Sequence, residues 1–212
     1  MSQPDTKQRL LDAAESLFAA EGFHSTSLRA VTGKAEANLA AVKYHFGSKE
    51  ALLEAVLNRR LVPLNQVRQE RLEALRMAAR QSGVRPATEA VLRAFIEPTL
   101  AFRDSGPGAE AFIQLVGRAI AEPDDTIRNL FMQLMKPLFL LIYDMLGEAL
   151  PELSDTERFW RLHFSLGALS HATCLAGRFQ ILPAGVTPRP DADALTAMLV
   201  NFLKMGMEAP CD

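Results

Sequence analysis

The residues with the clearest chemical character lie between Asn38 and Lys49, where small, basic and aromatic side chains follow one another. Asn38 is a residue type that caps the free N–H groups at the start of a helix. Val42 and Phe46 are four residues apart, so they share one face of that helix and can pack inward. The stretch therefore predicts a short helix with one buried face and one free face.

The free face of this helix carries Leu39, Ala40 and Lys43. Small and apolar side chains allow a helix to enter a major groove and touch thymine methyl groups, and a lysine can reach a guanine edge or a phosphate. Alternatively, Lys43 is a solvated surface lysine, and Leu39 and Ala40 belong to the core. Their helical phase differs from that of Val42 and Phe46, which favours a face directed at DNA.

A second group of candidates follows at once. Tyr44 and His45 precede the core residue Phe46, and Ser48 and Lys49 open the next helix. Side chains of these types donate hydrogen bonds to phosphate oxygens, and such contacts fix the position of a protein on DNA. Alternatively, the two aromatic residues are half-buried and only cover a small core. Their order along the chain favours phosphate contact.

The charge of the chain is nearly balanced, with a net charge of −2 and a pI near 6.1. That balance argues mildly against nucleic-acid binding, because domains that bind nucleic acids are usually basic. The segment from His24 to Lys49 differs, since Glu36 alone opposes four basic residues. A small basic patch suits a protein that gains affinity by placing two copies on one duplex. The four are Arg29, Lys34, Lys43 and Lys49.

Three helices must position these side chains. Apolar residues at helical spacing predict a first helix that stops at Gly22, and Thr26 and Ser27 are suitable caps for a short second helix. Residues 34–37 form a turn, and Asn38 opens the third helix. A helix followed by two short helices around a tight turn is the helix-turn-helix plan.

The segment from Thr6 to Leu57 resembles the N-terminal domain of the TetR/AcrR family of bacterial transcription regulators. The most specific resemblance is the run Tyr44–Leu52, and Gly22-Phe23 and Thr26-Ser27-Leu28 also match. In that family the start of the second helix donates to phosphate. The resemblance therefore adds Thr26 and Ser27 to the predicted DNA contacts, which are otherwise Asn38, Leu39, Ala40, Lys43, Tyr44, His45 and Lys49.

The resemblance also implies an architecture and a partner set. It implies a DNA-binding domain at residues 1–50 and a helical domain at residues 51–212 that holds a ligand and dimerises through the last two long helices. The expected partners are a palindromic double-stranded operator, a second copy of the chain and a small apolar or amphipathic effector, without a cofactor. Three segments also resemble the branch related to fatty-acid-responsive regulators: Asn38–Val42, Leu115–Arg118 and Phe159–Phe164.

Glu36 departs from the family pattern, which usually has a glycine in the turn. A residue other than glycine at positive φ is strained by about 1 kcal/mol. An acidic side chain near DNA is also unfavourable. The turn is therefore the position where the docking of this protein is expected to differ from that of the family.

The remainder of the sequence predicts further helices and no strand, so the fold class is all-α. One long helix or two in series cover Glu50–Gln81, with Pro63 as a kink or break and an exposed arginine-rich face. Pro183–Pro190 reads as an extended loop. The other predicted helices span 87–103, 109–121, 124–150, 154–179 and 191–207.

Two groups of residues in these helices are candidates for binding. Apolar helix faces interrupted by a few polar groups predict a ligand pocket, in which those groups could meet an anionic or hydrogen-bonding head group; plain core is the alternative. Small and apolar residues in the last two helices predict a four-helix dimer interface. The pocket candidates are Phe112, Leu115, Arg118, Phe131, Met135, Phe139, Tyr143 and His163, and the dimer candidates are Leu166, Gly167, Ser170, Cys174, Leu195, Met198, Leu199 and Phe202.

Other functional classes find little support in the sequence. His171 and Cys174 have the spacing of a metal pair but lack a third ligand, and no catalytic motif is present. The polar N-terminus predicts no signal peptide. The longest apolar run, Leu138–Ile142, is too short for a membrane span. The two cysteines, Cys174 and Cys211, form no disulfide framework. The sequence therefore predicts a cytoplasmic regulator that acts as a repressor. The alternative is an adaptor of the same fold that binds a protein partner.

Overall fold

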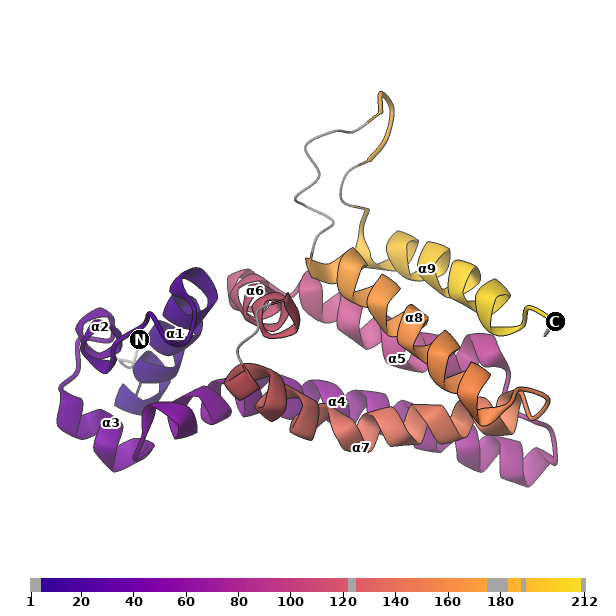
Figure 1. The fold of residues 1–212 in the computed structure, drawn as a ribbon, viewed down its shortest axis with the longest axis horizontal. Coiled ribbons are helices and arrows are strands. Elements are labelled where there is room, and N and C mark those ends of the chain that lie inside the picture. The colour runs from indigo at the N-terminus through magenta and orange to yellow at the C-terminus, as the bar shows by residue number, and fades with distance from the viewer. Residues whose placement is uncertain (1–4, 122–124, 175–182, 188–189, 211–212) are drawn as a thin grey trace. The chain divides into compact units, whose positions relative to one another are not determined.

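The computed structural model describes residues 5–121, 125–174, 183–187 and 190–210 and shows only helices among them (Figure 1). The prediction of an all-α fold is confirmed. The helices are α1 (Thr6–Glu21), α2 (Leu28–Lys34), α3 (Leu39–His45), α4 (Lys49–Ser82), α5 (Thr88–Arg103), α6 (Pro107–Ala121), α7 (Asp125–Ala149), α8 (Asp155–Cys174) and α9 (Ala192–Met207).

The helices form two compact units. Unit 1 comprises Met1–Pro63 and Ser105–Leu134, and unit 2 comprises Leu64–Asp104 and Met135–Asp212. Both α4 and α7 therefore contribute residues to each unit. These units describe packing alone, so the functional division into residues 1–50 and 51–212 stays a prediction.

The core of unit 1 forms around α1. Leu10, Ala14 and Phe18 recur at helical spacing and are fully buried, with Val31 of α2 and Val42 of α3 beside them in the small core. α6 packs along α1, so a helix distant in sequence completes this unit. Each Å2 of apolar surface that this packing removes from water contributes about 25 cal/mol to the stability of the unit.

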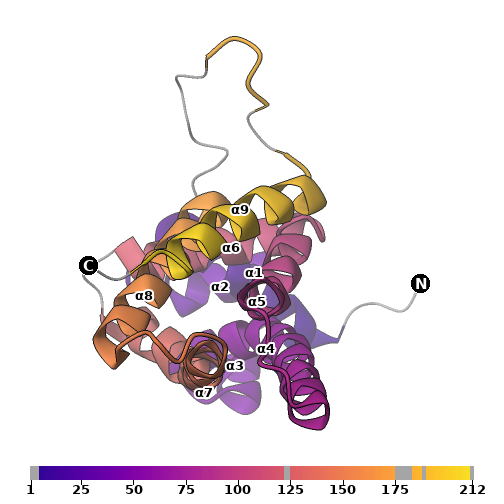
Figure 2. The same cartoon turned by 90° about the vertical axis from the view of Figure 1, so that its right-hand side faces the viewer.

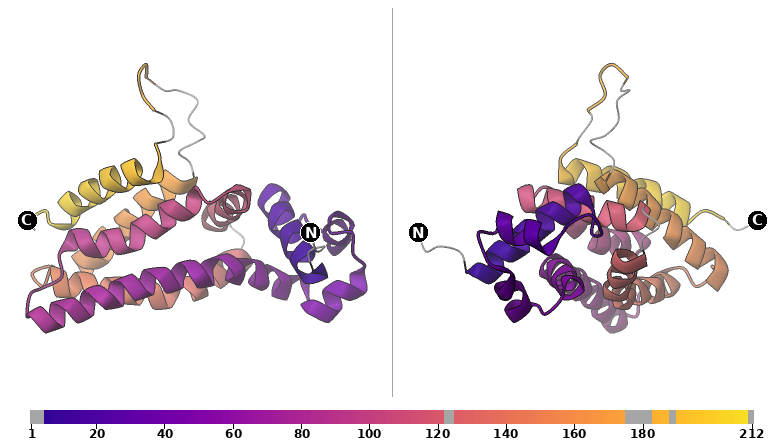
Figure 3. Two further views of the ribbon diagram at one scale, coloured as in Figure 1. Left: turned by 180° about the vertical axis from the view of Figure 1, so that it is seen from behind. Right: turned by 60° about the vertical axis from the view of Figure 1, so that its left-hand side comes forward.

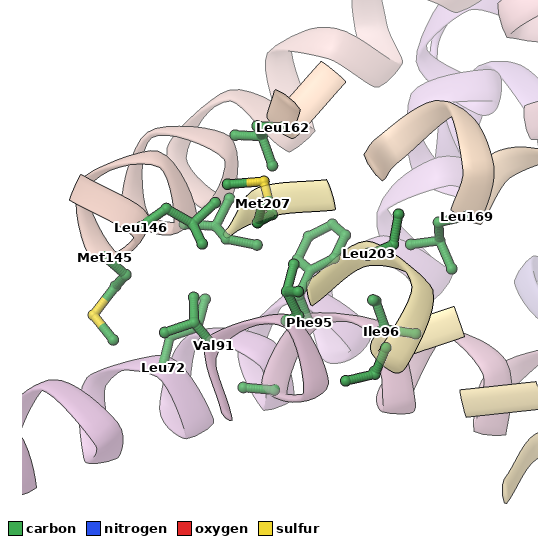
Figure 4. Packing of buried hydrophobic residues seen from close by; sticks show 14 of the residues in the cluster. Leu72, Val91, Phe95, Ile96, Met145, Leu146, Leu162, Leu169, Leu203 and Met207 are labelled. Atoms are coloured by element: carbon green, nitrogen blue, oxygen red, sulfur yellow. The ribbon is translucent and has the colours of Figure 1, made fainter. Parts of the chain in front are cut away.

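The core of unit 2 is a larger apolar cluster shared by α4, α5, α7, α8 and α9 (Figure 4). α9 packs most extensively against α5, and it also runs beside α8 (Figure 2). Phe95, Leu146 and Leu203 are representative of the cluster, and each is at most 5% exposed. A rigid apolar interior of this kind tolerates a charged group only when that group is hydrogen-bonded or paired.

Prolines lie inside three of the helices without ending them. α4 continues through Pro63 as one helix of 34 residues (Figure 3), and α5 and α7 continue through Pro98 and Pro137. The alternative of two helices in series across Glu50–Gln81 is therefore wrong. Each proline still removes one backbone hydrogen bond from its helix.

The predicted exposed arginine face of α4 is wrong in part. Arg68 is only 4% exposed, and Arg59 and Arg60 both donate to the carboxylate of Glu15 on α1. These partners lie 44 and 45 residues away in sequence, which local periodicity does not reveal. Arg71 and Arg80 are exposed, as expected.

Within the described residues, one stretch is long and apolar enough to cross a membrane, judged by length and composition only. It is Ile127–Ala149 of α7. The core helix of a soluble protein can meet the same criterion. α7 places Leu138, Ile142 and Met145 in the core of unit 2, where they are at most 4% exposed, whereas only 22% of the most apolar part of the stretch is buried.

Candidate nucleic-acid interface

α3 has a buried and a free face, as its sequence predicts, but Phe46 lies just after the end of the helix and is only half-buried. The side chain of Asn38 accepts a hydrogen bond from the backbone N–H of Ala41 at 2.9 Å and so caps the helix. Val42 is 1% exposed, whereas Leu39 is 46% exposed, and Ala40 and Lys43 are exposed as well. The outer face is therefore free to meet a partner.

The turn before α3 keeps a positive φ although it carries Glu36. The φ angle of Glu36 is 48°, and the backbone N–H of Ala37 donates to the carbonyl of Thr32 at 2.9 Å. Arg9 of α1 donates through Nη1 to the carbonyl oxygen of Glu36 at 3.3 Å. Arg9 thus ties the first helix to the strained residue, which helps to hold the turn in its shape.

We expect Glu36→Gly to raise the free energy of unfolding by about 1 kcal/mol, because glycine adopts positive φ without steric strain. Urea denaturation measures the change. Glu36→Gln is the matched control, since it removes the same charge but keeps a side chain at positive φ. An equal gain in both variants would show that charge, and not the backbone, is responsible.

The start of α4 lies close to the loop that follows α1. Ser48 caps α4 by accepting from the backbone N–H of Ala51 at 3.1 Å. The ammonium group of Lys49 lies 4.4 Å from the centroid of the Phe23 ring and donates to the carbonyl of His24 at 3.5 Å. Partial burial lowers the pKa of Lys49, and the neighbouring carboxylate of Glu50 opposes that effect. A phosphate contact by Lys49 would therefore start from an ammonium that is already oriented.

Thr26 and Ser27 have different surroundings. Thr26 is 1% exposed and donates to the carbonyl of Gly22 at 2.8 Å, so its hydroxyl holds the loop after α1. Ser27 is exposed and caps α2 by accepting from the backbone N–H of Ala30 at 3.1 Å. Of this pair, only Ser27 offers surface to a phosphate.

An open groove runs between the start of α1 and the outer face of α3. Its volume is about 590 Å3. Tyr44, 86% exposed, stands beside it, and the ring of His45 lies edge-on to that of Tyr44 with centroids 5.0 Å apart. The groove brings together four predicted DNA contacts and one residue that sequence reasoning missed, Arg9. The lining residues are Thr6, Arg9, Glu36, Ala37, Asn38, Ala40, Ala41, Tyr44 and His45.

Arg9 was missed because its role depends on a contact 27 residues away. In the sequence it reads as an ordinary polar position on α1. Its Nη2 donates to the hydroxyl of Thr6 at 3.3 Å, so the guanidinium is held at the edge of the groove. A cation at this edge suits a surface that meets phosphates.

The predicted pocket residues fall into both units. Phe112 and Leu115 are buried in unit 1, where Phe131 is half-buried. The side chain of Arg118 lies outside the described part of the structure. The other four candidates belong to unit 2, among them Met135, whose sulfur accepts from Asn65 Nδ2 at 3.6 Å.

Three of the unit 2 candidates come together. The ring of Phe139 stacks on that of Tyr143 and lies edge-on to that of His163, with centroids 6.3 and 5.5 Å apart. The hydroxyl of Tyr143 donates to the carbonyl of Asp155 at 3.2 Å, and Nδ1 of His163 lies 3.0 Å from the carbonyl of Phe159. These polar groups therefore already have backbone partners.

The predicted dimer residues divide between core and surface. Leu199 is 8% exposed, and Leu166 and Leu195 pack against the core of unit 2, so these three offer little surface to a partner. Ser170 is half-buried, and the side chain of Cys174 lies outside the described part of the structure. The exposed residues form an apolar stripe on α8 and α9 that we call the α8–α9 face: Trp160, Phe164, Gly167, Met198, Phe202 and Met205.

Trp160, Phe164 and Met205 were not among the predicted dimer residues, although spacing could have revealed them. Trp160, Phe164 and Gly167 follow one another at intervals of four and three residues, which places them on one face of a helix. Met198, Phe202 and Met205 repeat the pattern in α9. Among the residues that the structure describes, no group of three or more candidate metal ligands is found.

Two family descriptions match the chain. "Bacterial regulatory proteins, tetR family" matches residues 10–56, and "Tetracyclin repressor-like, C-terminal domain" matches residues 93–206. The HTH-type transcriptional regulator UidR of Escherichia coli (strain K12) is 39% identical over 56 residues, which are 26% of this chain and 28% of UidR. SrpR of Pseudomonas putida is 40% identical over 60 residues, which are 28% of each chain. The chain thus matches little more than a quarter of the length of these relatives.

Solved structures of similar fold extend the likeness to nearly the whole chain. The fatty acid degradation regulator FadR from Bacillus halodurans superposes with a TM-score of 0.70 at 12% identity, over 98% of this chain and 99% of FadR. FadR from Bacillus subtilis, in complex with stearoyl-CoA, gives 0.69 at 13% identity, over 94% and 98%. At these identities the likeness concerns the fold. Since the C-terminal description alone covers more than half of the chain, the protein belongs to the TetR family of transcriptional regulators, which bind DNA and are not enzymes.

Proposed function

We propose that this protein is a ligand-controlled repressor that binds a palindromic operator as a homodimer. The observation that carries the proposal is the outer face of α3, where Leu39, Ala40, Lys43 and Tyr44 are exposed above a buried Val42. In this proposal α3 enters the major groove, while Ser27, His45, Lys49 and Arg9 meet the phosphates. Such a regulator acts in the cytoplasm, where its operator lies.

The α8–α9 face supports the homodimer. Phe164, Phe202 and Met205 are 68%, 70% and 67% exposed, and solvent-exposed apolar side chains in such a cluster mark a surface that binds another protein. A two-fold axis through this face would join two α8–α9 pairs into a four-helix bundle. Two α3 helices would then read half-sites about 34–36 Å apart, or one further turn away.

The effector is proposed to bind among the helices of unit 2, which enclose the large apolar cluster. FadR of Bacillus subtilis, which shares the fold, was solved with stearoyl-CoA, and this supports an apolar or amphipathic effector here. Release of DNA requires only that the ligand binds the DNA-free state of the protein more tightly than the DNA-bound state. A ligand that binds the DNA-free state about 100-fold more tightly shifts operator binding by about 2.7 kcal/mol.

Binding measurements on two lysine variants test the DNA-binding part of the proposal. An operator is first selected from a random duplex library with the wild-type protein. We expect Lys43→Ala to weaken binding to that operator about tenfold while changing binding to unrelated DNA little, because a base contact is lost. We expect Lys49→Ala to weaken binding to all DNA and to reduce the salt slope by about 1, because a phosphate contact is lost.

Lys136→Ala is the matched control, because Lys136 is an exposed lysine of α7 outside the proposed interface. Thermal melts of all three variants separate loss of binding from loss of folding, which matters for Lys49 because it also contacts Phe23. If the Lys43 variant bound the operator as tightly as the control, and the Lys49 variant kept the salt slope of the control, the proposed docking of α3 and α4 on DNA would be refuted.

A further inference from the structure

Arg68 of α4 is a buried cation in unit 2. It is 4% exposed, and the two hydrogen bonds of its guanidinium go to uncharged acceptors. Nη1 donates to the amide oxygen of Asn65 at 2.7 Å, and Nη2 donates to the hydroxyl of Thr99 at 2.6 Å. The face of the Phe95 ring lies 4.7 Å from the guanidinium carbon. These contacts orient Arg68 without neutralising its charge.

Two other arginines on the unit 2 part of α4 are paired with carboxylates. Arg71 forms an ion pair with Glu97 at 2.8 Å, and Arg76 forms one with Glu148 at 3.1 Å. Arg68 forms no ion pair with a carboxylate among the residues that the structure describes, although it is the most buried of the three. Arg68, whose burial makes an unpaired charge most unfavourable, is thus the arginine without a carboxylate partner.

The guanidinium of Arg68 also keeps unused hydrogen-bond donors. A guanidinium has five N–H groups, and Nε of Arg68 is buried without a hydrogen-bond partner. Burial lowers the pKa of Arg68 to about 9, so the group is still charged at neutral pH. A buried charge without a counterion is strongly unfavourable. An anion bound at the guanidinium would satisfy both the charge and the free donors.

We propose that Arg68 anchors an anion-binding site in unit 2 and that its ligand is a monocarboxylate on an apolar body. The planar fork of a guanidinium matches the two oxygens of a carboxylate. One unpaired cation balances one negative charge, which favours a carboxylate over a dianionic phosphate. The neighbouring Phe95 and Leu72 belong to the apolar cluster of unit 2, which suits the rest of such a ligand (Figure 4).

This inference rests on the proposed function, because it names the chemical class of the effector. Calorimetric titration of the full-length protein with octanoate, 1-octanol and octyl phosphate at pH 7, below micelle formation, tests it. We expect wild-type protein to bind octanoate at least about tenfold more tightly than either other probe, because only octanoate supplies one matched charge. Equal affinity for octanoate and 1-octanol, or tighter binding of octyl phosphate, would overturn the assignment.

Variants at the anchor supply the second arm of the experiment. Arg68→Met should bind octanoate no better than 1-octanol and should melt at or above the wild-type temperature, because a buried unpaired charge is gone. Arg68→Lys keeps the charge but loses the fork, so it should retain only part of the preference for octanoate. Arg71→Met, the same change at an exposed position on the same helix, should keep the whole preference.

Two results at Arg68 would overturn the inference: an Arg68→Met protein that keeps the preference for octanoate, or one that melts well below wild type. Operator binding with and without octanoate separates this inference from the proposed function. If octanoate binds through Arg68 but leaves operator affinity unchanged, ligand control by this site fails and the anion site stands. If another ligand releases the operator while octanoate does not bind, the anion site fails and the regulator stands.

Discussion

Replacing Glu15 by alanine is expected to lower the free energy of unfolding by about 3–5 kcal/mol, because it removes one partner of a buried ion cluster. Glu15 is 3% exposed and accepts from Arg59 at 2.5 Å and from Arg60 at 2.9 Å. The hydrogen bond to Glu15 raises the pKa of Arg60. Without the carboxylate of Glu15, the partly buried Arg60 would lose its carboxylate partner, and Arg59 would keep only the exposed Asp12.

Asp12→Ala is the matched control for this prediction. Asp12 also pairs with Arg59, but its side chain is 65% exposed, and exposed pairs contribute about 0–1 kcal/mol. Urea denaturation at one protein concentration compares the two variants, which keeps any contribution of dimerisation equal. A loss for Glu15→Ala no larger than that for Asp12→Ala would mean that solvent screens the cluster.

Replacing Phe202 by glutamate is expected to weaken the proposed homodimer at least about 100-fold, because a charge would be buried in the α8–α9 face. Phe202 is 70% exposed within one chain, so the substitution leaves the core of unit 2 intact. The affinity for the operator should fall as the dimer dissociates, because a single chain contacts only one half-site. Sedimentation velocity over a concentration series measures the dissociation.

Met77→Glu controls for the introduced charge. Met77 is an apolar residue of α4 that is 60% exposed and does not belong to the α8–α9 face. The Met77→Glu protein should remain a dimer at concentrations where the Phe202→Glu protein is monomeric. A Phe202→Glu protein that sediments like wild type would show that the two chains associate through another surface, or not at all through α9.

The helices could be predicted from the sequence because their signals are local. The caps Ser27, Asn38 and Ser48 hydrogen-bond to backbone N–H groups only three residues away, so residue type and position suffice to find them. The phase of Val42 against Lys43 follows from the same short-range periodicity. The positive φ at Glu36 could likewise be expected, because the turn geometry is common to the family.

Long-range pairing could not be predicted in the same way. Arg59, Arg60 and Arg68 share a sequence pattern with the exposed Arg71, and only tertiary packing distinguishes them. The same limitation affects the dimer residues, since Leu199 and Phe202 lie on one apolar helix but one enters the core and the other remains exposed. Which apolar stripe faces the interior depends on the neighbouring helices, and the sequence of one helix does not contain that information.

Pro63 has a mechanical consequence for α4. It is the last residue of this part of unit 1, and Leu64 begins unit 2, so the missing backbone hydrogen bond lies where one unit ends and the next begins. From Pro63 back to Lys49 the helix measures about 21 Å at 1.5 Å per residue. A bend of about 5° in α4 at the proline would move the Lys49 end of the helix by roughly 2 Å. In the proposed dimer α4 of both chains would bend, and the separation of the two α3 helices would change by up to about twice that amount.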